Sequence, residues 1–393
     1  MLGLTPSHLS PRVHRQVVRL GTLLPFAQAA AVLDDLTGTT VSPTTVRRLT
    51  EQAGSAYVAV QEAAVDTPDT LPPPAELASD QRLQLSVDGA LVPLVGGTWE
   101  EVKTLVVGEL DATGQAHALS YFARLSDHLT FSRQAVVETQ RRGVEAAAVV
   151  CAVSDGADWI QQFIDDHRPD AVRILDWAHV VGYLSKAAQA AWGAGTLRAA
   201  AWLDVRLHTL RDGEPAPVVA AVRRLLRLVQ ARGGSAAAQE TIATTLGYLE
   251  KRVPQMHYAQ YRAQGYPIGS GIVESGNRVA VQRRLKGPGM HWARAHIDPL
   301  VALSGVECNG RWAEAWPQLQ HWQQQQRQAA RGSRVARRSA PATPPPLAAA
   351  PVQGPARPRP AAATTRPGQS RRPHRPAADH PWRRMASGRP RSA

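Results

Sequence analysis

The stretch QLSVDGALVPL, residues 84–94, alternates apolar residues with small or polar ones and is typical of a β-strand. Two more strand-like stretches follow, TLVVGEL at 104–110 and HALSYFARL at 117–125, each joined to the previous one by a short link. Because short turns join antiparallel neighbours, the three stretches predict an antiparallel meander. Asp88 lies inside the first strand, where a carboxylate is costly to bury unless it is paired or binds a cation.

Downstream of the meander, helical and strand-like stretches alternate. The pattern predicts a helix, a buried strand, a second helix, a short strand and a third helix, at residues 130–142, 147–153, 158–167, 172–175 and from 180 onward. Alternation of this kind is typical of parallel strands. The predicted fold class is therefore α/β, with a mixed five-stranded sheet and helices on both of its faces.

The N-terminal residues 1–65 predict a helical region that precedes the sheet. Within it, Gly38 ends one helix and Ser42-Pro43 begins the next, which gives a helix-turn-helix-like pair. The second helix of such a pair either enters a DNA groove or simply packs against its neighbours. The polar residues that would contact DNA are Thr44, Thr45, Arg47 and Arg48.

Composition sets the other boundaries. We predict a Pro-rich linker at 66–80, the first part of the core at 81–192, an all-helical insertion at 193–266, the last part of the core at 267–320 and a disordered Arg/Pro-rich tail at 321–393. The formal net charge of +13 lies in this tail, because residues 331–393 contain fourteen arginines and one acidic residue. The tail would add salt-dependent, sequence-independent affinity for nucleic acid.

The cellular compartment follows from what the chain lacks. Two cysteines, Cys151 and Cys308, cannot build a disulfide framework or a Cys-rich zinc site. No apolar run reaches the roughly 18 residues of a membrane helix, and the N-terminus lacks the pattern of a signal peptide. We therefore expect a cytoplasmic protein without a membrane partner, associated with the nucleoid if it binds DNA.

Three carboxylates stand out because the predicted elements bring them to one edge of the sheet. Asp88 lies in the first strand, and Asp155 ends the strand AVVCAVSD, where α/β sheets present ligands. Glu274 lies in the first turn of a helix that is predicted to follow the Gly-Ser-Gly bend 269–271, with Ser270 as its N-cap. Taken singly, each residue is explained as well by a turn or by the helix dipole. Only the three together indicate a functional site.

Convergent carboxylates without a Cys/His cluster suit the oxygen-preferring ions Mg²⁺ or Mn²⁺. Two such ions roughly 3.5–4 Å apart would support phosphoryl transfer. After Glu274, a polar stripe at helical spacing would hold phosphates, and it consists of Arg278, Gln282 and Lys286. Other acidic residues are predicted to be solvated, namely Glu100, Glu101, Asp165, Asp166 and Asp204.

At these residues the chain resembles bacterial insertion-sequence transposases of the DDE type, most closely the ISKra-type family. The likeness spans about residues 20–316, and it is carried by LPFAQAAAVLDDLTGTTVSPTTVRRL (24–49), LSVDGALVPLVGGTWEEVKTLVVGEL (85–110), VSDGADWIQQF (153–163), ILDWAHVVGYL (174–184), YPIGSGIVESGNRVAVQRRLKGPGMHW (266–292) and NGRWAEAW (309–316). The resemblance implies an RNase H-like catalytic fold with a helical insertion between the second Asp and the Glu.

The resemblance also implies a chemistry. Asp88, Asp155 and Glu274 would be the ligands of two Mg²⁺ or Mn²⁺ ions, used to cleave the terminal inverted repeats of a mobile element and to join the freed 3′-hydroxyl to target DNA. The protein would act as a homo-oligomer on DNA. Family members commonly carry an upstream cysteine-bearing segment that this chain lacks, so an N-terminally truncated product is one expectation.

Two further motifs leave alternatives open. Asp176 to His179 is similar to the acidic-x-x-His signature of Mutator-like transposases, in which His179 either positions a phosphate or is a buried structural residue beside Trp177. His291 and Trp292 match a position where a ring either stacks on a flipped base or packs. The leading hypothesis is a DNA transposase. The alternatives are a catalytically inactive DNA-binding remnant and an RNase H-fold nuclease or resolvase.

Overall fold

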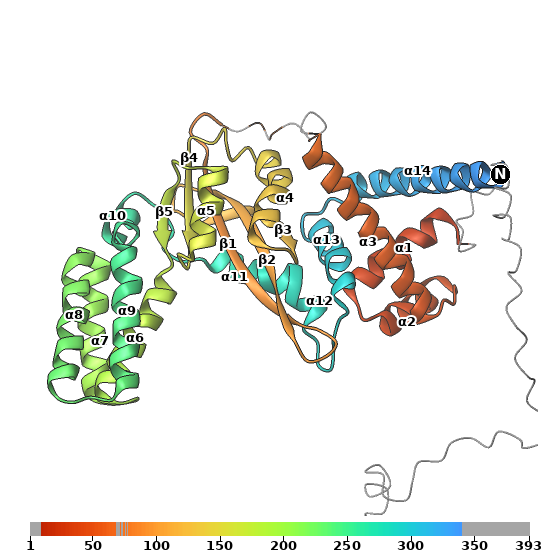
Figure 1. The fold of residues 1–393 in the computed structure, drawn as a ribbon. Coiled ribbons are helices and arrows are strands. Elements are labelled where there is room, and N and C mark those ends of the chain that lie inside the picture. Colours follow the sequence, from red (N-terminus) through yellow and green to blue (C-terminus); the bar gives the residue numbers. More distant parts are fainter. Residues whose placement is uncertain (1–8, 68–70, 72–73, 75, 77, 340–393) are drawn as a thin grey trace, which may run out of the picture. The chain divides into compact units, whose positions relative to one another are not determined.

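A five-stranded mixed sheet lies at the centre of the computed structural model, which describes residues 9–67, 71, 74, 76 and 78–339. The strand order is β3-β2-β1-β4-β5 (Figure 1). β1 (Arg82–Pro93) pairs antiparallel with β2 (Trp99–Leu110), which pairs antiparallel with β3 (Ala116–Arg124). β4 (Val149–Ser154) runs parallel to β1, and β5 (Val172–Leu175) runs parallel to β4. The predicted α/β class, with its meander and its parallel half, is confirmed.

Helices cover both faces of this sheet. One face packs against α4 (His128–Arg141) and α5 (Asp158–His167) through a cluster that includes Leu83, Leu85, Phe131 and Phe163. The other face packs against α12 (Arg283–Leu285) and α13 (Ile297–Cys308) through a cluster that includes Ala90, Val92, Leu285 and Leu300. β1 therefore turns its apolar residues to one face before Asp88 and to the opposite face after it.

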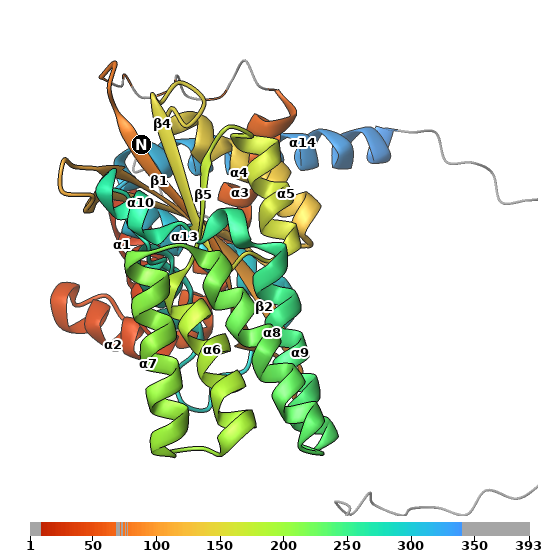
Figure 2. The same ribbon diagram turned by 90° about the vertical axis from the view of Figure 1, so that its left-hand side faces the viewer.

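The predicted insertion is helical, as expected, but it begins earlier than residue 193. α6 (Trp177–Trp192), α7 (Leu197–Asp212), α8 (Pro215–Ala231) and α9 (Ala236–Lys251) lie side by side (Figures 1 and 2). The 3₁₀ turn η2 (Val253–Gln255) and α10 (Tyr258–Ala263) complete it. α6 contacts α7, α8 and α9, and it also shares a buried cluster with β4 and β5, so it joins this bundle to the sheet.

The chain returns to the sheet through a continuous helical segment. α11 (Gly271–Gly276) leads into the π-helical segment η3 (Asn277–Gln282) and then into α12. A second 3₁₀ turn, η4 (Arg294–His296), precedes α13. π-helical turns are rare and occur frequently at functional sites, and this one directly follows the turn that carries Glu274.

The N-terminal helices are α1 (Pro11–Leu23), α2 (Phe26–Thr37) and α3 (Pro43–Asp66). As predicted, Gly38 ends α2 in a left-handed conformation, and Ser42 caps α3 by accepting a hydrogen bond from the Thr45 N–H. The three helices share one buried cluster with α13 and α14 (Trp312–Ser339), which includes Val18, Leu49, Leu303 and Trp316. The helix-turn-helix-like region is therefore packed onto α13 and α14 and is not a separate unit.

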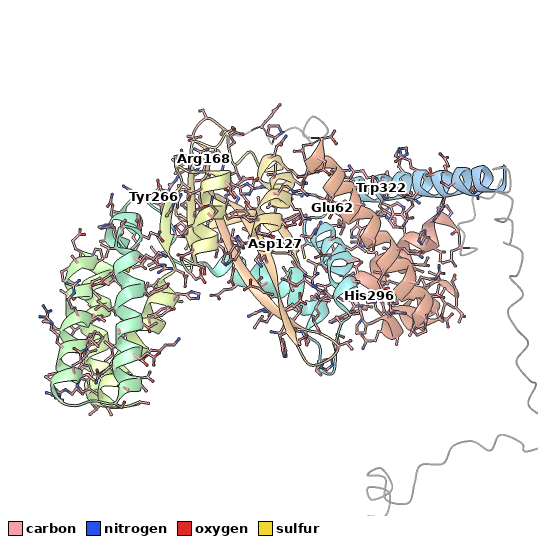
Figure 3. All side chains as sticks on the ribbon, in the orientation of Figure 1. Glu62, Asp127, Arg168, Tyr266, His296 and Trp322 are labelled. Atoms are coloured by element: carbon pink, nitrogen blue, oxygen red, sulfur yellow. The ribbon has the colours of Figure 1, made fainter. Side chains whose placement is uncertain are left out.

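Polar contacts and close backbone approach reinforce this junction. His296 Nδ1 lies 3.1 Å from Glu51 Oε1 of α3, and Trp322 of α14 packs against the shared cluster (Figure 3). α3 crosses α13 at Gly54, where an added Cβ would lie 2.1 Å from the Pro299 carbonyl oxygen. Only a residue without a side chain allows the two helices to approach this closely.

The tail prediction needs correction at its start. α14 continues to Ser339, so the first part of the stretch predicted to be disordered, residues 321–339, is helical. Leu319 and Trp322 pack against the N-terminal helices, which gives the start of this extension a tertiary anchor that composition does not reveal. Residues 340–393 and much of the predicted linker 66–80 lie outside the described residues. Among the helices that are described, none is long and apolar enough to cross a membrane.

Replacing Gly54 by Ala tests the close crossing of α3 and α13. We expect Gly54→Ala to lower the free energy of unfolding by about 1–3 kcal/mol, because the added methyl group overpacks against backbone that cannot rotate away. Urea denaturation followed by circular dichroism measures the change. Gly332→Ala in α14 is the matched control, since nothing lies within 4 Å of its Cβ position. It should leave stability unchanged or raise it by up to about 1 kcal/mol. Equal stability of the two variants would contradict the packing described.

Candidate active site

Asp88 lies within β1, and Asp155 directly follows the neighbouring parallel strand β4. The last pair of the β1–β4 register is Leu85 with Ala152, and each aspartate follows its strand's last paired residue by three positions. Burial raises the pKa of Asp88, and the negative charge of Asp155 raises it further, whereas a hydrogen bond from the Gly89 backbone and the nearby His179 oppose the shift. The two predicted aspartates are therefore brought together, and they repel each other when both are charged.

The helical segment after the Gly-Ser-Gly bend supplies a partner to Asp88. The Asn277 side-chain amide donates a hydrogen bond of 2.8 Å to Asp88 Oδ2. Its neighbour Gly276 permits this approach, because a Cβ there would lie 2.5 Å from a methyl carbon of Val106 on β2. The pair Gly276-Asn277 thus draws α11 onto the sheet next to the first aspartate.

Glu274 occupies a different environment. Its side chain is exposed, and in the described part of the chain it makes no hydrogen bond or ion pair with Asp88 or Asp155. Glu274 does share a helix face with Asn277, three residues later, and Asn277 contacts Asp88. Among the described residues, no group of three or more His, Cys, Asp or Glu side chains is arranged to hold a metal ion.

Asp176 is the buried polar centre of the region, with 1% of its surface exposed. Oδ2 accepts hydrogen bonds from the backbone N–H of His179 (2.9 Å) and from its ring Nδ1 (2.8 Å). Oδ1 accepts one from the Ser270 backbone N–H (2.7 Å). Asp176 thereby joins the end of β5, the start of α6 and the turn that precedes Glu274. Ser270 is the N-cap residue of α11, as predicted, but its side chain makes no cap hydrogen bond, and its backbone N–H donates to Asp176 instead.

His179 is not the buried structural histidine that one interpretation predicted. Its side chain is 45% exposed, while that of its partner Asp176 is 2% exposed. The hydrogen bond to Asp176 raises the pKa of His179 despite partial burial, and the charges of Asp176, Asp155 and Asp88 add to the effect. The His179 imidazole therefore lies near the two aspartates, in surroundings that favour its protonated form.

The helical insertion braces the turn that follows the second aspartate. The Tyr248 hydroxyl of α9 donates a hydrogen bond of 2.7 Å to the Asp155 carbonyl oxygen. Arg252 Nε donates one of 2.8 Å to the carbonyl oxygen of Gly156, a residue with φ of 77°. A side chain at residue 156 would both strain that left-handed backbone and collide with Arg252. The insertion thus holds Asp155 in place from its backbone side.

Two acidic residues on β2 were predicted to be solvated, and Glu101 is exposed as predicted, whereas Glu100 is half-buried. Glu100 forms an ion pair with Arg294, and Glu101 forms one with Lys103. Glu101 lies against Gly89, where a Cβ would be 2.3 Å from its Oε1, and its charge contributes to the raised pKa of Asp88. The sequence pattern did not reveal that Glu101 lies near Gly89 and Asp88, because this proximity arises from the register between β1 and β2.

The predicted DNA-contacting residues lie largely at the surface. Thr44, Arg47 and Arg48 are exposed on α3, whereas the Thr45 hydroxyl contacts the Ser42 hydroxyl at 3.0 Å. In the polar stripe after Glu274, Arg278 and Lys286 are exposed and Gln282 is half-buried. All of these side chains except those of Thr45 and Gln282 are accessible to a polyanionic ligand.

Trp292 packs, as one of its two interpretations predicted, while His291 is exposed. The indole Nε1 donates to the Leu285 carbonyl oxygen at 2.9 Å. The Arg284 guanidinium lies 5.1 Å from the Trp292 ring centroid and 4.5 Å from that of Phe26 in α2. Burial lowers the pKa of Arg284 to about 10. This cluster ties α12 to the N-terminal helices.

Two residues of this site, Asn277 and Arg252, escaped sequence reasoning, and Asp176 was singled out only as part of the acidic-x-x-His motif. Asp176 follows a strand and precedes a helix, which is a signal for an N-cap, but its bond to Ser270 depends on a distant turn. Asn277 and Arg252 sit in helical patterns where polar residues are expected at the surface. Comparison with known proteins adds nothing to these assignments, because no protein-family model and no curated protein matches the chain.

Replacing Asp176 by Asn tests the electrostatic coupling at this site. The raised pKa of His179 means that its pairing contributes stability below pH 6.5, the ordinary value, and that this contribution is lost as the pH rises through the folded-state pKa. In Asp176→Asn we expect the pKa of His179 to fall toward 6.5 and this pH dependence to disappear. NMR titration of the histidine ring protons measures the pKa.

Asp204→Asn is the matched control for this titration. Asp204 pairs with His208 in an exposed Asp-His pair on α7, 3.4 Å apart. The substitution should leave the pKa of His179 unchanged. A His179 pKa that is the same in wild type and in Asp176→Asn would show that the hydrogen bond is not the cause of the shift.

Proposed function

We propose that the protein is a DNA transposase that cleaves the ends of a mobile element and transfers the freed 3′-hydroxyl into target DNA. The observation that carries the proposal is the proximity of Asp88, in β1, and Asp155, directly after the parallel strand β4, to each other and to His179, whose pKa is raised. Paired carboxylates at a strand end, close to a positively charged group, suit phosphoryl-transfer chemistry on a polyanionic substrate.

The arrangement of the sheet supports this assignment. The order β3-β2-β1-β4-β5, with β1–β3 antiparallel and β4 and β5 parallel to β1, agrees with the RNase H-like fold that the sequence resemblance implies. A helical bundle between Asp155 and Glu274 agrees with the insertion implied by the same resemblance. The fold name rests on this topology and on the motifs.

The donor set fits a divalent metal ion. Asp88 is half-buried beside a second carboxylate and an amide, and its pKa is raised by burial and by the Asp155 charge. A bound cation would compensate both effects, and oxygen donors suit Mg²⁺ or Mn²⁺. Asp88 and Asp155 would hold the ions. Glu274 would be the third ligand, because it shares a helix face with Asn277, which contacts Asp88. When bound, two such ions stabilise the attacking and leaving oxygens of an in-line displacement.

The residues of the chain have separate tasks in this proposal. Asn277 orients the Asp88 carboxylate through its amide hydrogen bond. Asp176 holds the His179 ring so that the imidazolium can bind a phosphate oxygen next to the carboxylates. Tyr248 and Arg252 fix the turn at Asp155. Arg278, Gln282 and Lys286 would continue the phosphate contacts along the helical segment.

The remaining proposals concern partners. The exposed residues Thr44, Arg47 and Arg48 of α3 would contact terminal inverted repeats. Since α1–α3 share a buried cluster with α13 and α14, DNA bound there would be held in a constant position relative to the carboxylates. We further propose that the protein acts as a homo-oligomer on DNA in the nucleoid.

Conservative substitutions of the three carboxylates test the catalytic assignment. Asp88→Asn, Asp155→Asn and Glu274→Gln should each lower Mg²⁺-dependent strand cleavage by at least about 10³-fold, equivalent to about 4 kcal/mol of transition-state stabilisation. DNA binding should be largely retained. Cleavage of labelled element-end DNA measures the rate, and the transfer of a labelled 3′ end into plasmid separates a transposase from a nuclease or resolvase.

Glu100→Gln is the control for this series, because Glu100 is a carboxylate of β2 engaged by Arg294. Its cleavage rate should stay within a factor of a few of wild type. Full activity of Asp155→Asn would refute the assignment, and full activity of Glu274→Gln alone would restrict the metal ligands to the two aspartates.

The DNA contacts of α3 can be tested independently of cleavage. Arg47→Ala and Arg48→Ala should each weaken DNA binding and lower the slope of log affinity against log salt by about 0.9 for each lost phosphate contact. Fluorescence anisotropy over a salt series measures both. Arg211→Ala on α7, an exposed arginine near Asp212, should change neither quantity. Unaltered binding in both α3 variants would remove DNA contact from this helix.

A further inference from the structure

Two tyrosines of the helical insertion form a stacked pair. Tyr183 of α6 and Tyr248 of α9 have ring centroids 3.8 Å apart and an interplanar angle of 14°. Thr245 of α9 donates a hydrogen bond of 3.3 Å to the Tyr183 carbonyl oxygen, which keeps the two helices in register. Both rings are half-buried, so the stack reaches the surface of the bundle.

The stack begins directly at the second aspartate. The Tyr248 hydroxyl donates to the Asp155 carbonyl oxygen, as described above. Tyr183 follows His179 by four residues, so the two side chains share one face of α6, one turn apart. His179 and Tyr183 therefore form a row on α6 that leads from the candidate active site at Asp155 toward the surface of the bundle.

One ring face of the stack is covered only by a flexible, exposed side chain that a ligand can displace. Arg252 lies 4.3 Å from the Tyr248 ring centroid, and it must cover the face opposite Tyr183 because the two rings are in contact. The outer face of Tyr183 is approached by Lys186, whose Nζ lies 5.3 Å from the ring centroid. Lys186 is an exposed, flexible cation, and in the described part of the chain no ion pair engages it. An aromatic face next to a free ammonium suits a base and its phosphate.

The residues before the two tyrosines are glycines, and packing does not explain them. An added Cβ at Gly182 or at Gly247 would meet nothing within 4 Å. Glycine destabilises a helix relative to alanine, so α6 and α9 are each destabilised at the residue that precedes the stacked tyrosine. Because these glycines have no side chain, a ligand can approach the backbone closely at both positions.

We propose that this surface, the tyrosine platform (Gly182, Tyr183, Lys186, Gly247 and Tyr248), binds an unpaired nucleotide next to the scissile phosphate. The base displaces the Lys186 side chain from the outer face of Tyr183 and stacks there, and the displaced ammonium binds a phosphate of the same strand. A paired base inside a duplex has no free face to offer, so the platform selects DNA whose end is melted or single-stranded. This inference rests on the proposed function, since the platform derives its role from its position beside Asp155.

Binding measurements with the full chain test the platform without requiring cleavage. The probes are a blunt DNA duplex and the same duplex with a short unpaired thymidine extension at one 3′ end, compared by fluorescence anisotropy in EDTA. Wild type should bind the extended duplex more tightly. Tyr183→Ala should weaken binding to the extended duplex by about 5- to 150-fold, the range for one lost base–aromatic stack, and leave blunt-duplex binding unchanged.

Two more variants separate stacking from a structural role. Tyr183→Phe keeps the ring and should retain the preference for the extended duplex. Gly247→Gln fills open space with a good helix former, so it should raise the melting temperature while weakening binding to the extended duplex. Equal affinity of wild type for both duplexes, or an unchanged preference in Tyr183→Ala, would overturn the platform. Loss of binding to both duplexes in Tyr183→Ala would also overturn it, since stacking on an unpaired base affects only the extended DNA.

The two proposals fail in different ways. If Asp155→Asn abolishes cleavage but Tyr183→Ala keeps the wild-type preference, only the platform is refuted. If Asp155→Asn cleaves normally while Tyr183→Ala loses the preference, the carboxylate assignment is refuted and the platform remains as a site for unpaired DNA.

Discussion

The buried carboxylate of Asp176 is the interaction on which the rest of the site depends. A charged group that is almost fully buried is tolerated only if hydrogen bonds replace its water, and here three N–H donors do so, from the backbone and ring of His179 and from the backbone of Ser270. Burial alone opposes ionisation, yet these bonds hold the pKa of Asp176 below its ordinary value. One side chain thus joins the end of the sheet, the start of the insertion and the turn before Glu274, so that elements distant in sequence meet at the two aspartates.

Glycines allow the backbone to approach closely at the other junctions. Gly276 brings α11 onto β2, Gly89 accommodates Glu101 beside Asp88, and Gly54 lets α3 cross α13. Around the last crossing, a shared apolar cluster makes the N-terminal helices part of the same core as α13 and α14. Packing therefore holds the helix-turn-helix-like region in a constant position relative to the carboxylates, and this position does not depend on a linker.

The helical insertion has two relations to the site. Its last long helix, α9, holds the turn at Asp155 through Tyr248 and Arg252. Its first helix, α6, carries His179 and Tyr183 on one face, from the carboxylates to the surface. Bracing by α9 explains why Tyr248 and Arg252 are there, but it does not account for the open glycines before both tyrosines, which is why the platform and the brace are separate features.

Local chemistry in the sequence determined the elements: period-two strands around Asp88, a serine cap at Ser42, glycine at the end of α2, and a helical insertion after β5. Such features depend on residues within a few positions of each other, so a single chain reveals them. Tertiary structure alone decided the contacts between distant residues. The parallel pairing of β1 with β4 brings Asp155 near Asp88, Asp176 bonds to Ser270, and Tyr183 stacks on Tyr248, while Glu274 stays exposed on its helix. These contacts arise because burial and hydrogen bonding are satisfied by the packed whole, and no local pattern encodes which distant partner will satisfy them.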